Sequence, residues 1–167
     1  MVQMGSDSRS HFSPFQFLVI TFLLQVRDVV SCPVGWISHK STCFGLFKKP
    51  MMNWYDAETA CQVKFQESHL ASLLNEDEMR AVSSFIKMNH KTVGHIWIGL
   101  QDIGWESVRN WQWKDMSPVS YIPWAPGQPS NRPKRGNCAE LYSKDYMQWS
   151  DDDCDLKHAY LCRFSRF

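Results

Sequence analysis

The chain has 167 residues, of which 44% are hydrophobic and 21% are charged, and its formal net charge at pH 7 is +1. A balance so close to zero gives no overall attraction to nucleic acid or to an acidic membrane surface, and neither partner is expected. The six cysteines include no Cys-x-x-Cys pair, which favours structural disulfides over a zinc site or a redox motif.

The first 31 residues have the pattern of a secretory signal peptide. Arg9 and His11 precede an apolar run over residues 15–26, and small or medium-sized residues follow at positions 29–31. A membrane anchor is the alternative interpretation, but a spanning helix needs about 20 apolar residues and this run is shorter. We therefore expect a signal peptide over residues 1–31, a secreted extracellular domain over residues 32–167, and no membrane span in the mature chain.

The mature chain begins with two short strands around a polar turn, over residues 32–44. This spacing is close enough for Cys32 and Cys43 to pair across a hairpin. A helix is then predicted from Asn53, a favourable N-cap residue. Its apolar positions recur at spacings of three and four along the helix, at Trp54, Ala57, Cys61 and Phe65.

A second helix is predicted from Asn75. Glu78 stands three residues later and completes a capping box. Met79, Val82 and Ile86 then form one apolar face. Both helices are therefore expected to be amphipathic, with their apolar residues packed in the core.

From residue 95 the hydrophobic period changes to two. Ile96, Ile98 and Leu100 alternate along a predicted strand, and residues 111–113 indicate another. Five of the eight prolines then fall between residues 117 and 137, where neither strands nor helices can continue. A loop of this length inside a compact domain is usually functional or disordered, and the flanking strands favour an ordered loop. Three further β-type segments are predicted at residues 138–142, 147–149 and 160–162.

Over residues 32–167 the sequence resembles a C-type lectin-like domain. The resemblance is carried by residues in the order typical of the family: Trp36, Cys43-Phe44, Trp54, Ala57-Glu58, Cys61, His69-Leu-Ala-Ser72, Trp97-Ile-Gly-Leu100, Trp111 to Trp113, Cys138, Trp149, Cys154 and Cys162. It implies an α+β fold in which two helices flank small antiparallel sheets, with a long irregular loop and three disulfides. The chain is most similar to small secreted vertebrate members, namely snake-venom galactose lectins, regenerating (Reg) proteins and eggshell lectins.

The resemblance also implies how the cysteines pair. The implied disulfides are Cys32–Cys43, Cys61–Cys162 and Cys138–Cys154. The second closes a loop of roughly 100 residues, for which the chain-entropy model gives about 4.7 kcal/mol of stabilisation. Because every cysteine is then used, the protein is expected to be a monomer or a non-covalent dimer.

Sugar-binding members of this family hold a calcium ion through the long loop and the strand that follows it. A hard cation takes oxygen ligands, and vicinal sugar hydroxyls complete them. The corresponding positions of this chain are Gln128 and Ser130 on either side of Pro129, then Gly136, Ser150 and Asp151. Asp151 is unchanged and Gln128 keeps a neutral oxygen, so these two residues form a weak, degenerate calcium site. A shift of register could add Asn131 and Asn137, but calcium is not expected to be a required cofactor.

The same loop carries a basic tip formed by Arg132, Lys134 and Arg135. Guanidinium and ammonium groups suit sulfate, carboxylate or phosphate, so this tip could bind an anionic glycan without a metal. The alternative is that these charges only keep an exposed loop soluble. The residues expected to bind the ligand are Gln128, Ser130, Asn131, Arg132, Lys134, Arg135, Asn137, Glu140, Ser150 and Asp151.

Three weaker signals lie outside this set. The aspartates at positions 151, 152, 153 and 155 could form another cation site or simply a solvated acidic turn. Trp124 and Trp105 are candidates for exposed rings that stack on sugars. The six histidines follow no His-Glu-x-x-His pattern and show no clustering typical of a metal site in the mature chain.

No nucleophile elbow or phosphate-binding loop occurs, so an enzyme is not expected. The leading hypothesis is a secreted, non-enzymatic lectin-like protein that binds a glycan or glycoprotein with weak or absent calcium dependence; an anionic glycan is among the candidates. A first alternative is a protein-binding module of the same fold without sugar binding. A second alternative is a structural protein of the extracellular matrix or of a biomineral.

Overall fold

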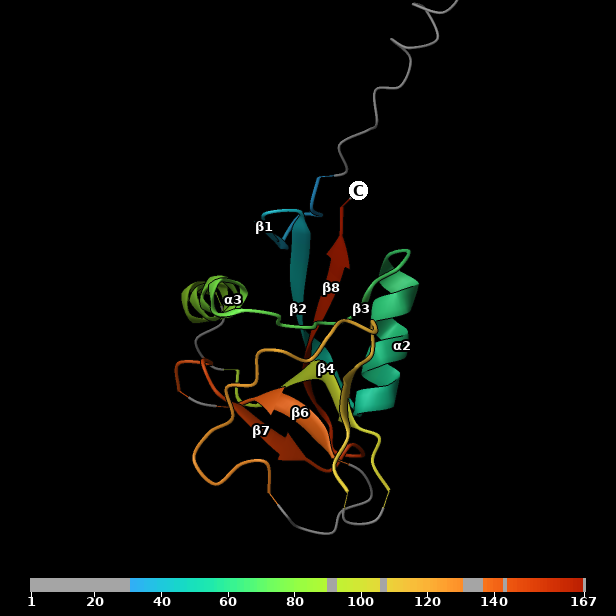
Figure 1. The fold of residues 1–167 in the computed structure, drawn as a ribbon. Helices are drawn as coiled ribbons and strands as arrows, with labels where there is room; N and C mark the ends of the chain where they lie inside the picture. Colours follow the sequence, from blue (N-terminus) through green and yellow to red (C-terminus); the bar gives the residue numbers. More distant parts are fainter. Residues whose placement is uncertain (1–30, 90–92, 106–107, 131–136, 143, 167) are drawn as a thin grey trace, which may run out of the picture. The chain divides into compact units, whose positions relative to one another are not determined.

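The computed structural model begins with a hairpin and two helices, and continues with shorter strands and a long loop (Figure 1). It describes residues 31–89, 93–105, 108–130, 137–142 and 144–166, all within the structural unit Ser31–Phe167. The elements are β1 (Ile37–His39), β2 (Thr42–Met52), α2 (Trp54–Lys64), β3 (His69–Leu70), α3 (Glu76–Asn89), β4 (Ile96–Asp102), β5 (Trp111–Trp113), β6 (Cys138–Leu141), β7 (Trp149–Asp152) and β8 (His158–Ser165).

The predicted signal peptide lies outside the described residues, except for Ser31, and stays a prediction. None of the helices in the described ranges is long and apolar enough to cross a membrane.

One mixed sheet joins the described strands in the order β1-β2-β8-β4-β6-β7, with β3 paired to β8 and β5 paired to β4. The pairs are antiparallel apart from β4 and β8, which run parallel with Trp97 opposite Tyr160. The α+β class with two helices is therefore confirmed, and the parallel pair is an addition to the expected antiparallel sheets. It places the residue that precedes β4 next to the first residue of β8.

Several strand limits differ from the prediction. β2 continues to Met52, although Gly45 and Pro50 are unfavourable in a strand, because β8 pairs with it from Thr42 to Phe47 and again at Met52 after a register shift. β8 covers residues 158–165 rather than 160–162, and β7 begins at Trp149 rather than at residue 147. Pairing with neighbouring strands, which local sequence does not reveal, decides these limits.

Both predicted helix starts are confirmed. The side chain of Asn53 accepts a hydrogen bond from the Asp56 nitrogen at 2.8 Å. Asn75 accepts one from the Glu78 nitrogen at 2.9 Å, and the Glu78 carboxylate turns back to the Leu74 nitrogen at 2.9 Å. Each helix thus has side-chain acceptors for amide groups that would otherwise lack a partner.

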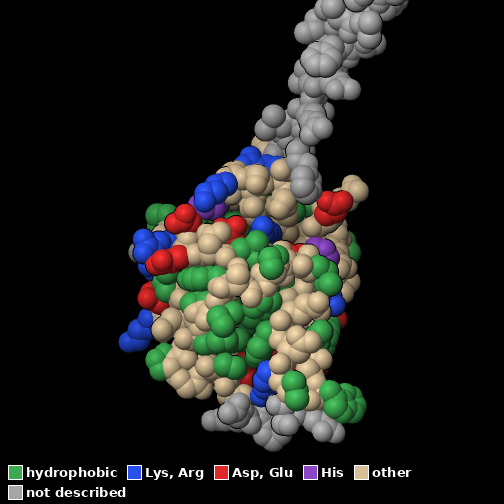
Figure 2. All heavy atoms as spheres, viewed as in Figure 1, with side chains coloured by type: hydrophobic (Ala, Val, Ile, Leu, Met, Phe, Trp, Pro, Cys, Tyr) green, Lys and Arg blue, Asp and Glu red, His purple; other side chains and the backbone are tan. Residues whose placement is uncertain are grey.

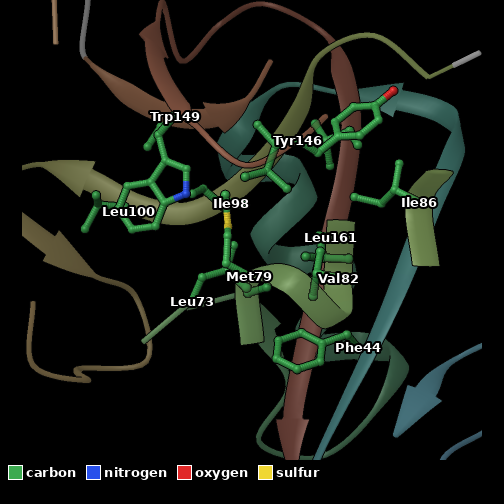
Figure 3. Packing of buried hydrophobic residues seen from close by; sticks show 14 of the residues in the cluster. Phe44, Leu73, Met79, Val82, Ile86, Ile98, Leu100, Tyr146, Trp149 and Leu161 are labelled. Carbon is green, nitrogen blue, oxygen red and sulfur yellow. The ribbon is translucent and has the colours of Figure 1, made fainter. Parts of the chain in front are cut away.

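The alternation predicted along β4 is confirmed, because Ile96, Ile98 and Leu100 share one core cluster, but the sheet is covered on both faces and the opposite face is buried too. Residues 96–100 are all buried. Ile98 joins the cluster beneath α3, where it lies near Met79 (Figure 3), whereas Trp97 joins a second cluster with Trp54 of α2. A strand between two apolar layers has no polar face. Alternation of side chains along β4 therefore separates two buried faces, not a buried face from an exposed one.

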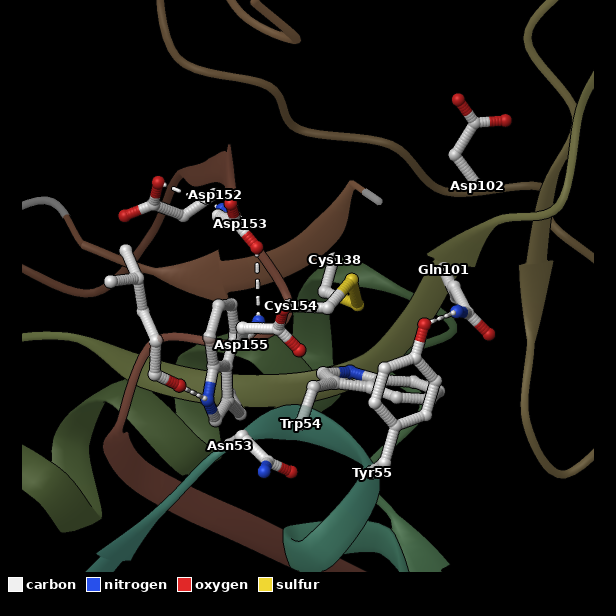
Figure 4. The surroundings of a disulfide bond; sticks show 12 residues. Asn53, Trp54, Tyr55, Gln101, Asp102, Cys138, Asp152, Asp153, Cys154 and Asp155 are labelled. Carbon is white, nitrogen blue, oxygen red and sulfur yellow. Dashed lines mark hydrogen bonds between the residues drawn. A yellow bond between two sulfur atoms is a disulfide. The ribbon is translucent and has the colours of Figure 1, made fainter. Parts of the chain in front are cut away.

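The three implied disulfides are confirmed, as Cys32–Cys43, Cys61–Cys162 and Cys138–Cys154. The second ties α2 to β8. The third joins the start of β6 to the turn that follows β7 (Figure 4). This disulfide therefore links the two ends of the segment that contains β6 and β7, which carry the predicted residues Glu140, Ser150 and Asp151.

The long loop crosses the face of the molecule shown in Figure 1, and its described part, residues 117–130, contains neither a helix nor a strand. In the same view, hydrophobic side chains gather in the middle of this face (Figure 2). The described part of the loop therefore crosses a face with a partly apolar surface.

Candidate functional site

The proline-rich loop is anchored to β7 just before the predicted binding residues. The Ala125 nitrogen donates to the Trp149 carbonyl at 2.8 Å, and the Trp149 nitrogen donates to the Pro123 carbonyl at 3.0 Å. The Trp124 ring packs on Trp111 and Trp149, with ring centroids 4.8 and 5.8 Å apart. Trp124 is therefore half-buried, which corrects its assignment as an exposed sugar-stacking ring.

This anchor brings Gln128 and Ser130 to Asp151 on β7. Asp151 is buried, and its two carboxylate oxygens accept hydrogen bonds from the Ser130 nitrogen at 2.5 Å and the Ser130 hydroxyl at 3.1 Å. The Gln128 side-chain oxygen accepts from the Asp151 nitrogen at 3.4 Å. The structure thus brings together these three residues of the predicted set, across a cis Gln128–Pro129 peptide bond.

A guanidinium group contacts the backbone of Ser130. Arg109 Nη1 is 2.6 Å from Asp102 Oδ2, and Nη2 donates to the Ser130 carbonyl at 3.0 Å. The Asn137 amide satisfies both of its neighbours when its nitrogen donates to Asp151 Oδ2 at 3.0 Å and its oxygen accepts from Arg109 Nη1. Sequence reasoning missed Arg109 and Asp102, because they precede the loop and only the fold brings them to it.

These residues do not fit a calcium ion. Calcium takes about six to eight oxygen ligands, but here the Asp151 oxygens already accept hydrogen bonds from Ser130 and, with the Asn137 amide in its flipped orientation, from Asn137. The positive charge at this position comes from Arg109, and Gly136 offers no side-chain oxygen. The arrangement is that of a closed hydrogen-bonded cluster with its own cation.

Asp102 fixes the position of Arg109. Burial acts to raise the pKa of Asp102, but hydrogen bonds from Arg109 and from the nitrogens of Asn110 and Gly104 outweigh it and hold the pKa below its ordinary value. The carboxylate is therefore charged at neutral pH. It orients the guanidinium toward the loop as a fixed group.

Two other predicted residues, Glu140 and Ser150, lie on the opposite side of the sheet from Asp151. Glu140 is paired with Ser150 and Ala139 with Asp151 between β6 and β7, and successive side chains of a strand point to opposite faces. The Glu140 side chain is 2% exposed and accepts from Ser150 Oγ at 2.9 Å. The structure therefore divides the predicted binding set between two faces.

Glu140 belongs instead to a cluster with two histidines. His95 Nδ1 is 2.9 and 2.8 Å from the two Glu140 oxygens, and His158 Nε2 is 3.5 Å from Glu140 Oε2. Burial raises the pKa of Glu140 above its usual range, although the bonds from His95 and Ser150 act in the opposite direction. Burial also lowers the pKa of His158, and the neighbouring His95 acts in the same sense.

The expectation that the histidines do not cluster is therefore wrong. His95 and His158 are far apart in sequence, but His95 directly precedes β4 and His158 is the first residue of β8, and these strands are parallel neighbours with Ile96 opposite Ala159. The signal available in the sequence was a histidine before each of two apolar segments. It could be used only with knowledge that these segments run side by side in the same direction.

The remaining predicted residues have different outcomes. Asn131, Arg132, Lys134 and Arg135 lie outside the described residues, and their roles stay predictions. In the acidic turn, Asp152 and Asp153 accept hydrogen bonds from the nitrogens of residues 153 and 155 at 2.9 and 3.1 Å (Figure 4). Trp105 is 82% exposed and remains a candidate contact residue.

Comparisons with known proteins agree with the fold. Residues 51–164 match the family model described as Lectin C-type domain. A C-type lectin of Thrasops jacksonii, one of the lectoxins, is 33% identical over 153 residues, which are 91% of this chain and 95% of that protein.

Two solved structures extend this similarity. Human lithostathine superposes with a TM-score of 0.75 at 32% identity, covering 84% of this chain and 94% of that one. A calcium-independent type II antifreeze protein superposes with a TM-score of 0.69 at 27% identity, covering 84% of this chain and 99% of that one.

Proposed function

The chain belongs to the C-type lectin domain family, and from this premise we propose that it is a secreted, non-enzymatic recognition protein that binds carbohydrate without calcium. The proposed binding surface consists of loop residues 128–137 and the adjoining edge of β7. The observation that carries the proposal is the position of Arg109. Its guanidinium is bonded to Asp102 and to the backbone carbonyl of Ser130, a residue at one of the positions that the family resemblance assigns to a metal.

A loop that is held together by an internal cation needs no calcium to keep its shape. The similarity to an antifreeze protein described as calcium-independent supports this interpretation, because the two chains superpose over most of their length. Ligand recognition then depends on protein groups alone. It also follows that a chelator should leave binding intact.

The sequence of the loop supports an anionic ligand. Arg132, Lys134 and Arg135 follow closely after the anchored residue Ser130. Their guanidinium and ammonium groups suit sulfate or carboxylate groups, and arginine can bind either of them through two hydrogen bonds. We therefore propose sulfated or uronic-acid-containing glycans as the ligand class.

The test is retention of the purified protein on immobilised heparin, measured in EDTA and in calcium. We expect equal retention under both conditions and elution by added salt. A variant with Arg132→Ala, Lys134→Ala and Arg135→Ala should elute much earlier. The matched control changes three exposed lysines elsewhere, Lys48, Lys49 and Lys87, to alanine and thus alters the net charge equally. Equal losses in both variants would mean only nonspecific charge attraction.

Calcium titration by calorimetry gives a second measure. The wild-type protein should show no strong calcium binding. Elution by EDTA alone, or tight calcium binding, would overturn the proposed calcium independence.

A protein ligand is the second candidate, and one observation favours it. Ile103, Trp105 and Val108 precede β5 and are 51%, 82% and 71% exposed. Exposed apolar and aromatic side chains of this kind are typical contact residues in protein interfaces. A glycan array without signal for neutral and sulfated sugars, together with a protein pull-down that Trp105→Ala abolishes, would favour this function over the first.

A further inference from the structure

Four side chains that sequence reasoning did not connect meet beside the parallel strands β4 and β8. They are His95 before β4, Glu140 on β6, Asp152 at the end of β7 and His158 at the start of β8. One possible ligand atom from each lies within 4.8 Å of the others. From this geometry we propose that the four residues bind a divalent transition-metal ion, with zinc as the favoured ion.

The distances between the ligand atoms suit one small ion. In a tetrahedral zinc site with bonds of about 2.0–2.1 Å, neighbouring ligand atoms are about 3.3 Å apart. Glu140 Oε2 is 2.8 Å from His95 Nδ1 and 3.5 Å from His158 Nε2, and His158 Nε2 is 3.8 Å from Asp152 Oδ2. Shifts of about half an ångström or less would bring these three distances to the spacing that zinc requires, and a larger movement of an exposed side chain would close the widest separation in the cluster, 4.8 Å.

The imidazole rings are held in place by a stack of aromatic groups. His95 stacks between Tyr142 and His158, with ring centroids 4.4 and 4.8 Å apart and interplanar angles of 20°. His158 in turn packs on Trp97 at 4.4 Å. Because the two imidazole planes are nearly parallel, one ring must turn before both nitrogen lone pairs can point at the same ion. The stack otherwise limits the ordering that metal binding would require of these side chains.

Groups outside the four residues give the support that metal ligands usually have. Ser150 Oγ donates to Glu140 Oε1 at 2.9 Å, and the His158 ring has a hydrogen bond with the Lys157 backbone. Hydrogen bonds of this kind orient ligands and fix the imidazole nitrogen that faces the metal. The cluster therefore has both candidate ligand atoms and the hydrogen-bonding groups that usually hold the ligands of a metal centre in position.

A simple His–Glu hydrogen bond does not account for the cluster. It explains His95, but His158 Nε2 is buried and only approaches the carboxylates, at 3.5 Å from Glu140 Oε2 and 3.8 Å from Asp152 Oδ2, without a hydrogen bond of normal geometry among the described residues. A buried polar atom without a partner is costly and rare. A metal ion between His158, Glu140 and Asp152 would give that nitrogen a bond and would neutralise the two carboxylates.

The mixture of ligands selects the class of ion. Two imidazoles and two carboxylates suit zinc and similar transition metals, whereas calcium prefers oxygen ligands alone. The side chains of His95 and Asp152 are 40% and 25% exposed, so an ion can reach the cluster from solvent, while Glu140 at 2% closes its inner side. The cluster lies on the opposite face of β6 and β7 from Asp151, so this site is separate from the proposed glycan surface.

The test is titration of the purified full-length protein with zinc alone, by calorimetry, and with cobalt alone, by visible absorption. We expect one zinc ion per chain and an intense cobalt absorption typical of a four-coordinate site. Glu140→Gln and His158→Phe should each weaken zinc binding by more than about a hundredfold, and Ser150→Ala by about tenfold. His158→Phe retains an aromatic ring for the stack. His69→Gln, which changes a histidine paired with Glu58 instead, should bind zinc as the wild type does.

Near-UV circular dichroism shows whether each variant is folded. If either ligand variant fails to fold, Ser150→Ala and the cobalt spectrum of the wild type decide the question. The proposal is overturned if the wild type binds no zinc stoichiometrically, if its cobalt spectrum is that of the hydrated ion, or if folded Glu140→Gln and His158→Phe bind zinc normally. Heparin retention tests the other face, so failure of one proposal does not imply failure of the other.

Discussion

At the scale of single residues, the position of Arg109 determines how the long loop is organised. Its side chain joins Asp102 at the end of β4 to Ser130 in the loop, across a sequence separation that includes β5. The carboxylate of Asp102 pairs with it, and a guanidinium beside this partly buried acid offsets the desolvation of the acid. Arg109 can therefore act as a permanent substitute for a bound ion.

Removing this cation should destabilise the protein and create a response to calcium. We expect Arg109→Ala to lower the free energy of unfolding by about 2 kcal/mol at pH 7, because charged hydrogen bonds are lost and Asp102 is left without its partner. Millimolar calcium should then raise the melting temperature of the variant but not of the wild type. Arg80→Ala is the control, since Arg80 forms only an exposed pair with Glu76. If calcium has no effect on Arg109→Ala, the guanidinium does not stand in for an ion.

The Asp102 carboxylate predicts a specific dependence of stability on pH. Its pKa in the folded protein is below the ordinary value of 3.8. A depressed carboxyl pKa contributes stability above the pKa of the unfolded chain, and this contribution is lost as the pH falls through the folded pKa. Asp102→Asn should therefore be less stable than the wild type at pH 7, and the difference should shrink below about pH 4.

Urea unfolding at pH 7, 5 and 3 measures this difference. Asp155→Asn, at an exposed position, provides the control. A stability gap for Asp102→Asn that is constant across the three pH values would show that the charge of Asp102 is not responsible.

At the scale of elements, caps and helical periodicity could be predicted from the sequence, whereas strand limits could not. Asn53 and Asn75 bind amides three residues further along, so a local pattern is sufficient to locate them. Gly45 and Pro50 argue against a strand locally, yet β2 includes both because β8 pairs beside it. Non-local pairing also explains why Arg109 and His158 were not foreseen, because the sequence does not show which distant segments lie beside them.

The cap of α2 can be tested by one substitution. Asn53→Ala should lower the free energy of unfolding by about 1 kcal/mol, because the Asp56 amide loses its side-chain acceptor. Chemical denaturation followed by far-UV circular dichroism is the measurement. Val63→Ala in the same helix changes an 81% exposed side chain and should have little effect. An equal loss in both variants would show that the effect is not specific to the cap, since Val63→Ala itself favours the helix.

At the scale of the whole molecule, disulfides connect the helical half to the half that carries the loop. Cys61–Cys162 spans a sequence separation of 101 residues, whereas Cys32–Cys43 spans 11. The Cys138–Cys154 bridge joins the start of β6 to the turn after β7, and these two strands carry Asp151 on one face and Glu140 on the other. The same short pair of strands can therefore support two binding regions.

The lengths of the closed loops predict unequal effects of removing the bridges. In the chain-entropy model the Cys61–Cys162 bridge contributes about 4.7 kcal/mol and the Cys32–Cys43 bridge slightly under about 3 kcal/mol. Replacing both cysteines of each pair by alanine should therefore cost about 2 kcal/mol more for the long loop. Cys61 and Cys162 are also fully buried, so lost packing acts in the same direction.

The dependence of unfolding on urea separates these two causes. A longer cross-linked loop restricts the unfolded chain more, so its removal should also increase the slope of the unfolding free energy against urea concentration. Lost packing alone would lower the midpoint and leave that slope unchanged. A greater stability loss for Cys61→Ala with Cys162→Ala but no change of slope would mean that this bridge stabilises the two halves through packing in the folded state, rather than by confining the unfolded chain.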